Sequence, residues 1–284
     1  STNGSYKNIA ITRGHRTSED VTIVRSGPDT RVMRPVYPPS DLKEPGTYLL
    51  AYLGIMGPQD GVDRAVDVME ELVHRRGRTD VRAVLMGFGD CLEELRAQST
   101  RLDLDDYITF TGRVGQREIA QYLSAADLGL GPDQNTPLND LSTMNKTMEY
   151  MAFALPSVSF DLAETRVSGG DTAIYVPSGD ITAFADAVED LLDDPDRRAV
   201  LGRAARERVS IELDWQAQAQ AYVSVFDKVL DRPLDDERLE NWPFVADEVP
   251  AYPEQPRVDL ADEAAYDAFL YGRGVATEKP RSVA

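Results

Sequence analysis

The chain has 284 residues, of which 42% are hydrophobic, and its formal net charge at pH 7 is −19. This length supports one large domain or two modest domains with a hydrophobic core. The strong negative charge repels nucleic acid and anionic lipid, so we exclude a nucleic-acid-binding role. The single cysteine, Cys91, excludes an intrachain disulfide and a cysteine-rich metal site.

The compartment is predicted from two features of the sequence. It contains no run of about 18 apolar residues, which a transmembrane helix requires. The opening residues, STNGSYKN, have neither the basic nor the apolar region of a signal peptide. We therefore expect a cytoplasmic protein.

Residues 1–45 do not read as the start of a self-contained domain. SYKNIAITR (5–13) predicts the end of a helix, and VTIVR (21–25) predicts a strand. The segment 26–46 is rich in proline and glycine and predicts a linker. We expect residues 1–45 to be the end of an N-terminal domain plus a hinge, and the chain to be a piece of a longer protein.

From residue 47 onward, apolar strands alternate with helices. The predicted strands are 47–54, 81–87, 106–112, 127–131, 156–160 and 173–177. The predicted helices are 61–76, 90–99, 116–125, a central helix within 139–160, and then 181–193, 196–211 and 215–230. This alternation predicts a doubly wound α/β domain over residues 46–232, with a parallel, six-stranded, Rossmann-like sheet covered on both faces.

Residues 233–284 form an acidic C-terminal extension that contains aromatic residues and a short helical stretch, DLADEAAYDAFLYG. One interpretation is a poorly ordered tail. The other is an arm that packs aromatic side chains on a neighbouring domain or subunit; these are Trp242, Phe244, Tyr252 and Tyr266. The sequence does not decide between them.

The ligand of a doubly wound sheet binds at the carboxyl ends of the strands, where the strand order reverses. That point is predicted between the first and fourth strands, whose following loops are GIMGPQDG (54–61) and GPDQNTPLND (131–140). GFGD (87–90) is a third glycine turn nearby. For each glycine taken alone, a tight-turn requirement is the favoured explanation.

The central stretch, residues 139–160, predicts a polar loop, a helix and a buried strand. Ser142 or Thr143 can cap the helix, whose free N–H groups and dipole suit an anion such as a diphosphate. Lys146 and Glu149 project together from the face opposite the predicted apolar stripe. That stripe consists of Met144, Met148, Met151 and Leu155. The alternative for the charged pair is a surface ion pair of little energetic value.

Other enzyme classes find little support. GIMGPQDG does not have the G-x-G-x-x-G spacing of a nicotinamide or flavin site. The second predicted strand also ends in glycine, where such a site has an acidic residue. His15 and His74 are far apart in sequence and have no serine elbow or metal-spaced partner. Hydrolase triads and metal catalysis are therefore not expected.

Several spaced motifs together resemble a known family. The motifs are YLGIMGPQDGVD, VLMGFGD, ITFTGRV, ADLGLGPD, NKTMEYMAFALPSVSFD and a late helix containing LDW. In this order, over about residues 5–230, they closely resemble the nucleotide-sugar-binding half of family-four retaining glycosyltransferases. The resemblance implies the C-terminal domain of a GT-B fold, with the acceptor-binding N-terminal domain missing.

The resemblance also implies roles for individual residues. Glu149 matches the glutamate that holds the ribose hydroxyls, and Lys146 matches a position near the donor diphosphate. Arg113 and Val114 match the turn whose backbone reads the base, and Asn139 lies with Asp140 where sugar hydroxyls would be met. The predicted catalytic residues are Lys146 and Asp140. The predicted donor-binding residues are Glu149, Arg113, Val114, Gly87, Gly89, Asn139, Ser142, Thr143 and Gly57.

Three positions depart from the family pattern. Leu141 stands where most members have a first glutamate, eight positions before Glu149. Ile55 and Asp60 stand where many members have an arginine and a lysine. The charge of a diphosphate must then be met by Lys146, by backbone N–H groups or by residues outside this chain.

The sequence thus predicts the donor-binding half of a retaining glycosyltransferase, inactive by itself. Its donor would be a nucleotide-diphospho-sugar, with UDP as the expected nucleotide. Its acceptor would be a glycan or glycolipid at the inner membrane face. No metal or separate cofactor is expected. The alternatives are a non-catalytic nucleotide- or partner-binding module and a GT-B nucleotide-sugar epimerase.

Overall fold

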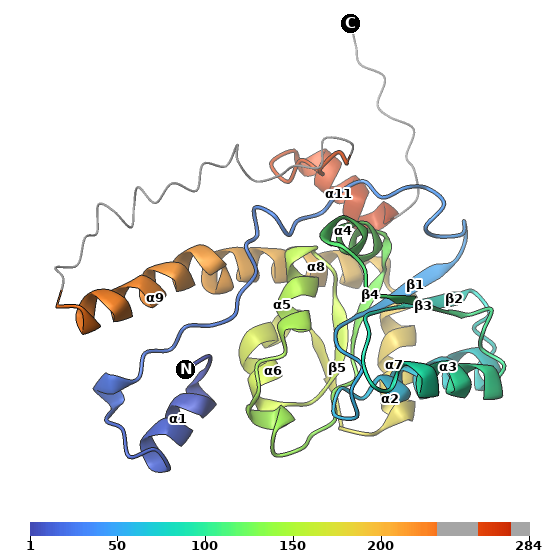
Figure 1. The fold of residues 1–284 in the computed structure, drawn as a ribbon. Helices are drawn as coiled ribbons and strands as arrows, with labels where there is room; N and C mark the ends of the chain where they lie inside the picture. The colour runs from blue at the N-terminus through green and yellow to red at the C-terminus, as the bar shows by residue number, and fades with distance from the viewer. Residues whose placement is uncertain (232–254, 274–284) are drawn as a thin grey trace, which may run out of the picture.

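The computed structural model describes residues 1–231 and 255–273, and a single parallel sheet lies at its centre (Figure 1). The strands follow the order β3-β2-β1-β4-β5-β6, and every neighbouring pair is parallel. They are β1 (Tyr48–Leu53), β2 (Val81–Met86), β3 (Ile108–Gly112), β4 (Leu128–Gly131), β5 (Ser157–Phe160) and β6 (Ile174–Val176). The predicted six-stranded, doubly wound sheet is confirmed, and the order reverses between β1 and β4 as expected.

Helices cover both faces of the sheet. The α-helices are α1 (Gly4–Thr12), α2 (Val62–Glu70), α3 (Leu92–Arg101), α4 (Gln116–Ala125), α5 (Asn145–Ala152), α6 (Ala163–Gly169), α7 (Ile181–Leu192), α8 (Pro195–Arg208), α9 (Trp215–Val229) and α11 (Glu263–Gly272). The shorter helical turns are η1 (Ser18–Asp20), η2 (Glu71–Arg75), η3 (Asn139–Leu141), η4 (Gly170–Thr172) and η5 (Val209–Leu213). Side chains of α2, α3 and α7 form the core on one face, and those of α4, α5, α8 and η5 form it on the other.

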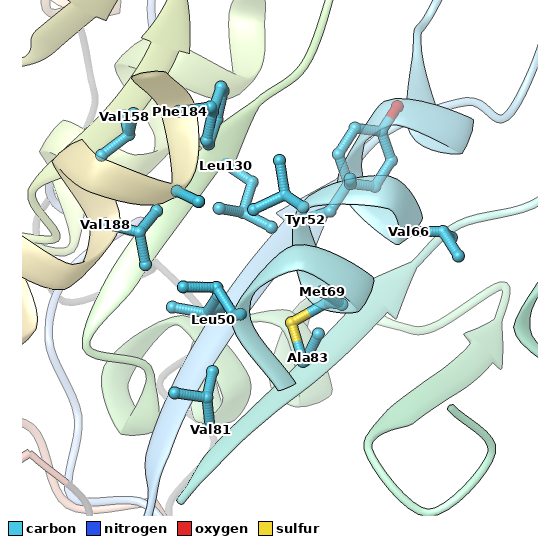
Figure 2. Close-up of a cluster of buried hydrophobic side chains, with 14 of the residues drawn as sticks. Leu50, Tyr52, Val66, Met69, Val81, Ala83, Leu130, Val158, Phe184 and Val188 are labelled. Atoms are coloured by element: carbon cyan, nitrogen blue, oxygen red, sulfur yellow. The ribbon is translucent and has the colours of Figure 1, made fainter. Parts of the chain in front are cut away.

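The side chains of β1 alternate between these two cores. Leu50 and Tyr52 pack with Met69 of α2 and Phe184 of α7 (Figure 2). Leu49 and Ala51 face the opposite core, which contains α5. A strand covered on both faces is apolar at successive positions, because neither set of side chains reaches water. This explains why YLLAYL reads as a continuous apolar run.

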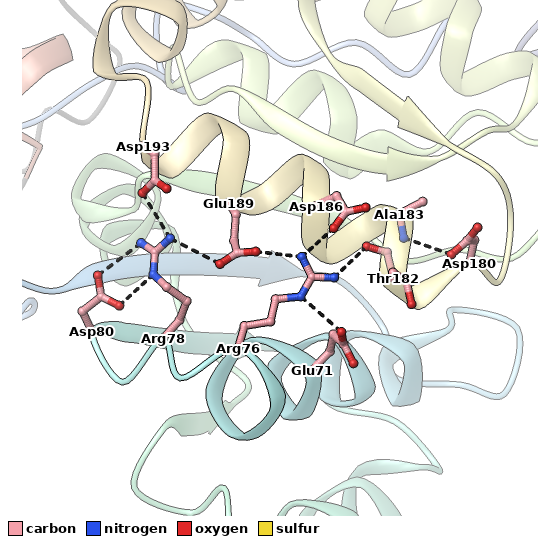
Figure 3. Close-up of polar contacts among 10 residues, drawn as sticks. All are labelled: Glu71, Arg76, Arg78, Asp80, Asp180, Thr182, Ala183, Asp186, Glu189 and Asp193. Atoms are coloured by element: carbon pink, nitrogen blue, oxygen red, sulfur yellow. Dashed lines mark hydrogen bonds and ion pairs between the residues drawn. The ribbon is translucent and has the colours of Figure 1, made fainter.

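An ion-pair network joins η2 to α7 (Figure 3). Arg76 lies 2.6 Å from Asp186, 2.7 Å from Glu189 and 3.1 Å from Glu71. Arg78 extends the network to Asp80 and Asp193, which lie 3.0 and 3.1 Å away. The network fastens two helical elements that cover the same face of the sheet.

The first 46 residues differ most from the prediction. The segment 21–25 is extended but is not a strand, because no strand in the described part of the chain pairs with it. Its Val24 N–H donates instead to the Ser1 carbonyl at 2.8 Å. The predicted linker is also anchored, since Val36 forms an antiparallel bridge with Arg257. The short helix α6 was not predicted.

The described part of the C-terminal extension packs on the sheet domain, where α11 lies beside α8 (Figure 1). Tyr266, Phe269 and Leu270 are buried with Ala154 and Ala199. Of the aromatic residues considered for a docking arm, Tyr266 therefore packs within its own chain. The other three, Trp242, Phe244 and Tyr252, lie outside the described residues.

Candidate donor-binding site

A cavity of about 610 Å³ opens at the carboxyl ends of β1, β2 and β3, beside the point where the strand order reverses. Its walls come from the loops after these strands and from α4 and α5. The predicted loop after β1 lines it, but the predicted loop 131–140 after β4 does not. Five of the predicted site residues line it together: Gly87, Arg113, Val114, Lys146 and Glu149. Residues far apart in sequence are thus brought to one place by the parallel topology.

Glycines let the loops of this cavity approach each other closely. Gly87 has φ of +151°, and a Cβ there would lie 1.8 Å from the carbonyl oxygen of Gly54. A Cβ on Gly89 would lie 2.5 Å from the Met56 carbonyl oxygen. Any side chain at either position would displace backbone, so both glycines are required by loop packing whether or not they also contact a ligand.

Lys146 is buried and does not pair with Glu149. Its ammonium lies 2.7 and 2.8 Å from the two carboxylate oxygens of Asp133, in the loop after β4. Lys146 is 8% exposed and Asp133 is 3% exposed. The predicted alternative of a surface ion pair with Glu149 is therefore wrong. Sequence reasoning missed Asp133, and the signal that could have indicated it is its place in the predicted fourth loop.

The loop after β1 borders the same ammonium. The Lys146 Nζ lies 5.4 Å from the ring centre of Tyr52, whose hydroxyl donates to the Ile55 carbonyl at 2.6 Å. Asp60 accepts a hydrogen bond from the Gly57 N–H at 2.9 Å. Burial raises the pKa of Asp60, opposed by that hydrogen bond and by the charge of Lys146.

Glu149 is a second carboxylate on the cavity wall. Burial raises its pKa, and the positive charge of Lys146 opposes this rise. Elsewhere on the wall, the guanidinium of Arg113 lies over the ring of Phe88, 4.2 Å from its centre. An acceptor for hydroxyl groups and a cation stacked on an aromatic ring therefore line one hollow.

The structure does not bring the η3 residues into this cavity. Asn139 is buried, and its amide donates to the carbonyls of Gln59 and Gln134 at 2.8 and 2.9 Å. The carboxylate of Asp140 accepts from the Ala163 N–H at 2.8 Å, at the start of α6. Gly57 lines a different hollow, between α2 and α3.

Ser142 and Thr143 contact the N-terminal segment instead of capping α5. The Ser142 hydroxyl lies 2.6 Å from that of Tyr6, and the Thr143 hydroxyl accepts from the Asn3 amide at 3.0 Å. The N-cap residue of α5 is Met144, which makes no side-chain capping bond. The predicted hydroxyl cap is therefore wrong, because the segment that carries α1 engages both hydroxyls.

Across residues 1–231 and 255–273, no three His, Cys, Asp or Glu side chains gather in a group that could hold a metal ion. Over the same residues, no helix combines the length and apolarity needed to cross a membrane.

Known proteins share this fold and parts of this sequence. HepE of Anabaena, in complex with UDP and glucose, has a TM-score of 0.67 at 17% identity, covering 80% of this chain and 62% of its own. The C-terminal domain of a glycosyl transferase group 1 family protein, LpcC of Francisella tularensis, has a TM-score of 0.56 at 18% identity, covering 66% of this chain and 99% of its own. The sheet is thus that of a GT-B C-terminal domain.

Curated relatives are longer than this chain. Glycogen synthase of Mycobacterium tuberculosis is 25% identical over 214 residues, which are 73% of this chain and 48% of that protein. A GDP-mannose-dependent phosphatidylinositol monomannoside mannosyltransferase of the same organism is 29% identical over 167 residues, 57% of this chain and 43% of that protein. The chain therefore spans about half the length of these relatives.

The family model described as "Glycosyl transferases group 1" matches residues 47–194, from the residue before β1 to the N-cap of α8. This range contains every strand of the sheet and the whole cavity wall. With the strand order and the position of the cavity, it establishes that this chain belongs to the glycosyl transferases group 1, or GT4, family.

Proposed function

We propose that this chain is the donor-binding half of a retaining glycosyltransferase that takes a sugar from a nucleotide-diphospho-sugar. The observation that carries the proposal is the meeting of Lys146 and Glu149 in one cavity at the strand-order reversal. In an open α/β sheet, this is where a nucleotide binds. We assign donor binding to residues 46–232. Residues 1–45 are then the end of an N-terminal domain plus a hinge, and residues 233–284 are a C-terminal extension.

Glu149 accepts hydrogen bonds from the ribose hydroxyls in this proposal, for which an ionised carboxylate is the stronger acceptor. Lys146 stabilises the negative charge that develops on the leaving diphosphate. Gly54 and Gly87 line the cavity without side chains, so phosphate oxygens can approach main-chain atoms there. The base lies against the turn at Arg113 and Val114, and Gly89 supports the adjoining loop.

The donor sugar lies on the side of the η3 loop in this proposal, where Asn139 and Asp140 define the loop shape. Ser142 and Thr143 contribute indirectly in this proposal, through Tyr6 and Asn3, and Gly57 contributes through the loop after β1. Because Asp140 holds the start of α6 through Ala163, we assign its catalytic contribution to positioning this loop. Leu141 replaces the first family glutamate, so the sugar contact differs from that of most members.

Transfer itself needs a second domain. We propose a glycan or glycolipid acceptor bound by an N-terminal domain, in the cytoplasm at the inner membrane face. The relatives support this division, since the chain covers 48% and 43% of their lengths. UDP is the first nucleotide to test because HepE binds it, and GDP is the second because of the GDP-mannose-dependent relatives.

The test is thermal unfolding of the chain with UDP, GDP, UDP-sugars and NAD. A ligand at 100 times its dissociation constant adds roughly 2.7 kcal/mol to the free energy of unfolding. We expect a shift of several degrees with UDP that Glu149→Ala and Lys146→Ala each reduce strongly. Glu207→Ala removes an exposed carboxylate on α8 and serves as the control.

Two outcomes would contradict the proposal. A shift with NAD but with no nucleoside diphosphate would indicate a different ligand class. A UDP shift that both site variants retain would place the nucleotide elsewhere and favour a non-catalytic module centred on the C-terminal extension.

A further inference from the structure

The charge balance around Lys146 is unusual for a site that must hold a diphosphate. Its side chain is 9% exposed and that of Asp133 is 4% exposed, so water screens the pair only weakly. Both oxygens of Asp133 accept from the ammonium, at 2.7 and 2.8 Å. Two of the three N–H donors of Lys146 are thus occupied by a fixed carboxylate, and one is left for a ligand oxygen.

A second carboxylate lies close to the same ammonium. Asp60 belongs to the loop that packs against the loop of Asp133, since a Cβ on Gly61 would lie 2.1 Å from the Pro132 carbonyl oxygen. The charge of Asp133 contributes to the raised pKa of Asp60, after burial, whereas the charge of Lys146 opposes it. The three groups therefore interact, and the carboxylates outnumber the ammonium.

A diphosphate that reaches the free N–H of Lys146 comes close to the carboxylate of Asp133 as well. Like charges at such a separation, poorly screened by solvent, repel each other strongly. Asp133 therefore opposes the ligand that Lys146 attracts, although it also keeps the buried ammonium from being unpaired when the site is empty. This repulsion by Asp133 acts on the phosphate groups of a ligand and not on its uncharged nucleoside.

We propose that Asp133 is an internal counter-ion that competes with the donor diphosphate for Lys146 and so sets how weakly the site holds nucleoside diphosphates. The inference rests on the proposed function, because it assigns a specificity role within the same site. Its chemical consequence is that the product diphosphate, which carries more negative charge than the sugar-linked donor, is opposed more strongly and released more readily.

The experiment measures dissociation constants of UDP and uridine by calorimetry for the wild type and for Asp133→Asn, which keeps the shape and one acceptor oxygen. We expect Asp133→Asn to tighten UDP binding by about tenfold and to leave uridine binding unchanged. Asp90→Asn removes an exposed carboxylate at the same end of the sheet and should change neither constant. Weaker or unchanged UDP binding in Asp133→Asn, or an equal gain for uridine, overturns the proposal.

A second comparison removes the charge of Lys146 from both variants. Lys146→Gln alone leaves Asp133 uncompensated, whereas Lys146→Gln with Asp133→Asn leaves no charge in the pair. We expect the double variant to bind UDP about tenfold more tightly than the single variant, and equal affinities overturn the proposal. If the wild type binds UDP and either comparison gives its negative result, the role of Asp133 is overturned but the proposed function is not. Binding of no nucleoside diphosphate by the wild type overturns the proposed function together with this inference.

Discussion

At the scale of single residues, Glu149 combines a functional position with an energetic cost. Its carboxylate is largely removed from water, and the neighbouring cation, Lys146, gives two of its hydrogen bonds to Asp133. Burial disfavours the charged form more than Lys146 favours it, so the pKa of Glu149 is raised in the folded protein. A carboxylate is thus kept on the cavity wall at a cost in stability.

Glu149→Gln is predicted to stabilise the chain at neutral pH. A raised pKa means that the folded state binds the proton more tightly than the unfolded state, so the wild type loses stability as pH rises from about 4.3 through the folded value. The glutamine variant lacks this loss. Chemical unfolding at pH 4 and pH 7.5 should therefore show a gain only at the higher pH, while UDP binding is weakened. A gain of equal size at both pH values would rule out the ionisation as its cause.

The buried pairing of Lys146 could not be predicted from the local helical pattern. A helical projection puts Lys146 opposite Met148 and Met151, which suggests solvent. However, α5 is enclosed by α6, α8 and β4, so its second face is buried as well. Asp133 lies 13 residues earlier in a loop, and no local pattern relates it to the helix. The positions of Glu149 and Arg113 were predictable because the resemblance and the parallel topology place them at the same edge.

At the scale of elements, the site depends on the contact between the loops after β1 and β4. Gly61, the N-cap residue of α2, has φ of +65° and ψ of 22°, and a Cβ would meet the Pro132 carbonyl at 2.1 Å. This contact sets how close Asp60 and Asp133 come to Lys146. The sequence predicted both loops and their adjacency, but it could not distinguish this glycine from one that serves only a turn.

Gly61→Ala and Gly77→Ala form a matched pair. Gly77 has a similar φ of +72°, but nothing lies within 4 Å of the point that a Cβ would occupy there. Gly77→Ala should cost about 1 kcal/mol from backbone strain alone, whereas Gly61→Ala should cost clearly more because backbone must also move. Urea unfolding measures both losses. Equal losses of unfolding free energy would mean that the contact between the loops after β1 and β4 can rearrange at no energetic cost.

The strand that was wrongly predicted at 21–25 shows the limit of local pattern. VTIVR has the composition of a strand, yet a strand forms only where another offers backbone partners. Here Val24 and Arg25 bond to the Ser1 carbonyl and the Gln218 side chain instead. The strands from β1 to β6 were predictable because each finds a parallel neighbour within the chain.

At the scale of the whole molecule, α11 is part of the folded unit. Phe269 is 5% exposed and packs towards Ala154 and Ala199 at the junction of α5 and α8. Arg273 is buried, which lowers its pKa to about 10, and it donates to the carbonyls of Ala126 and Ala154. The sequence predicted this helix but not the surface on which it packs, because that surface is assembled from distant segments.

Phe269→Ala is predicted to lower the free energy of unfolding of the whole chain by about 3 kcal/mol, in one cooperative transition. Tyr271→Phe is the control, since Tyr271 is 54% exposed and loses only a hydrogen bond to Asp196. Far-ultraviolet circular dichroism during heating reports the transition. An unchanged midpoint for Phe269→Ala would show that α11 contributes nothing to the stability of the sheet domain.

The anchoring of residues 28–37 has a mechanical consequence. Arg206 donates to the Thr30 carbonyl at 2.8 Å, and Asp214 accepts from both the N–H and the hydroxyl of Thr30. Together with the bridge between Val36 and Arg257, these bonds fix residues 28–37 to the sheet domain, so this stretch is not a flexible linker. Residues 1–25 are bonded to the same domain, because the Asn3 amide donates to the Leu141 carbonyl of η3 and the Arg25 N–H donates to the Gln218 side chain of α9. Force applied to the N-terminal segment therefore reaches the η3 loop directly through these bonds.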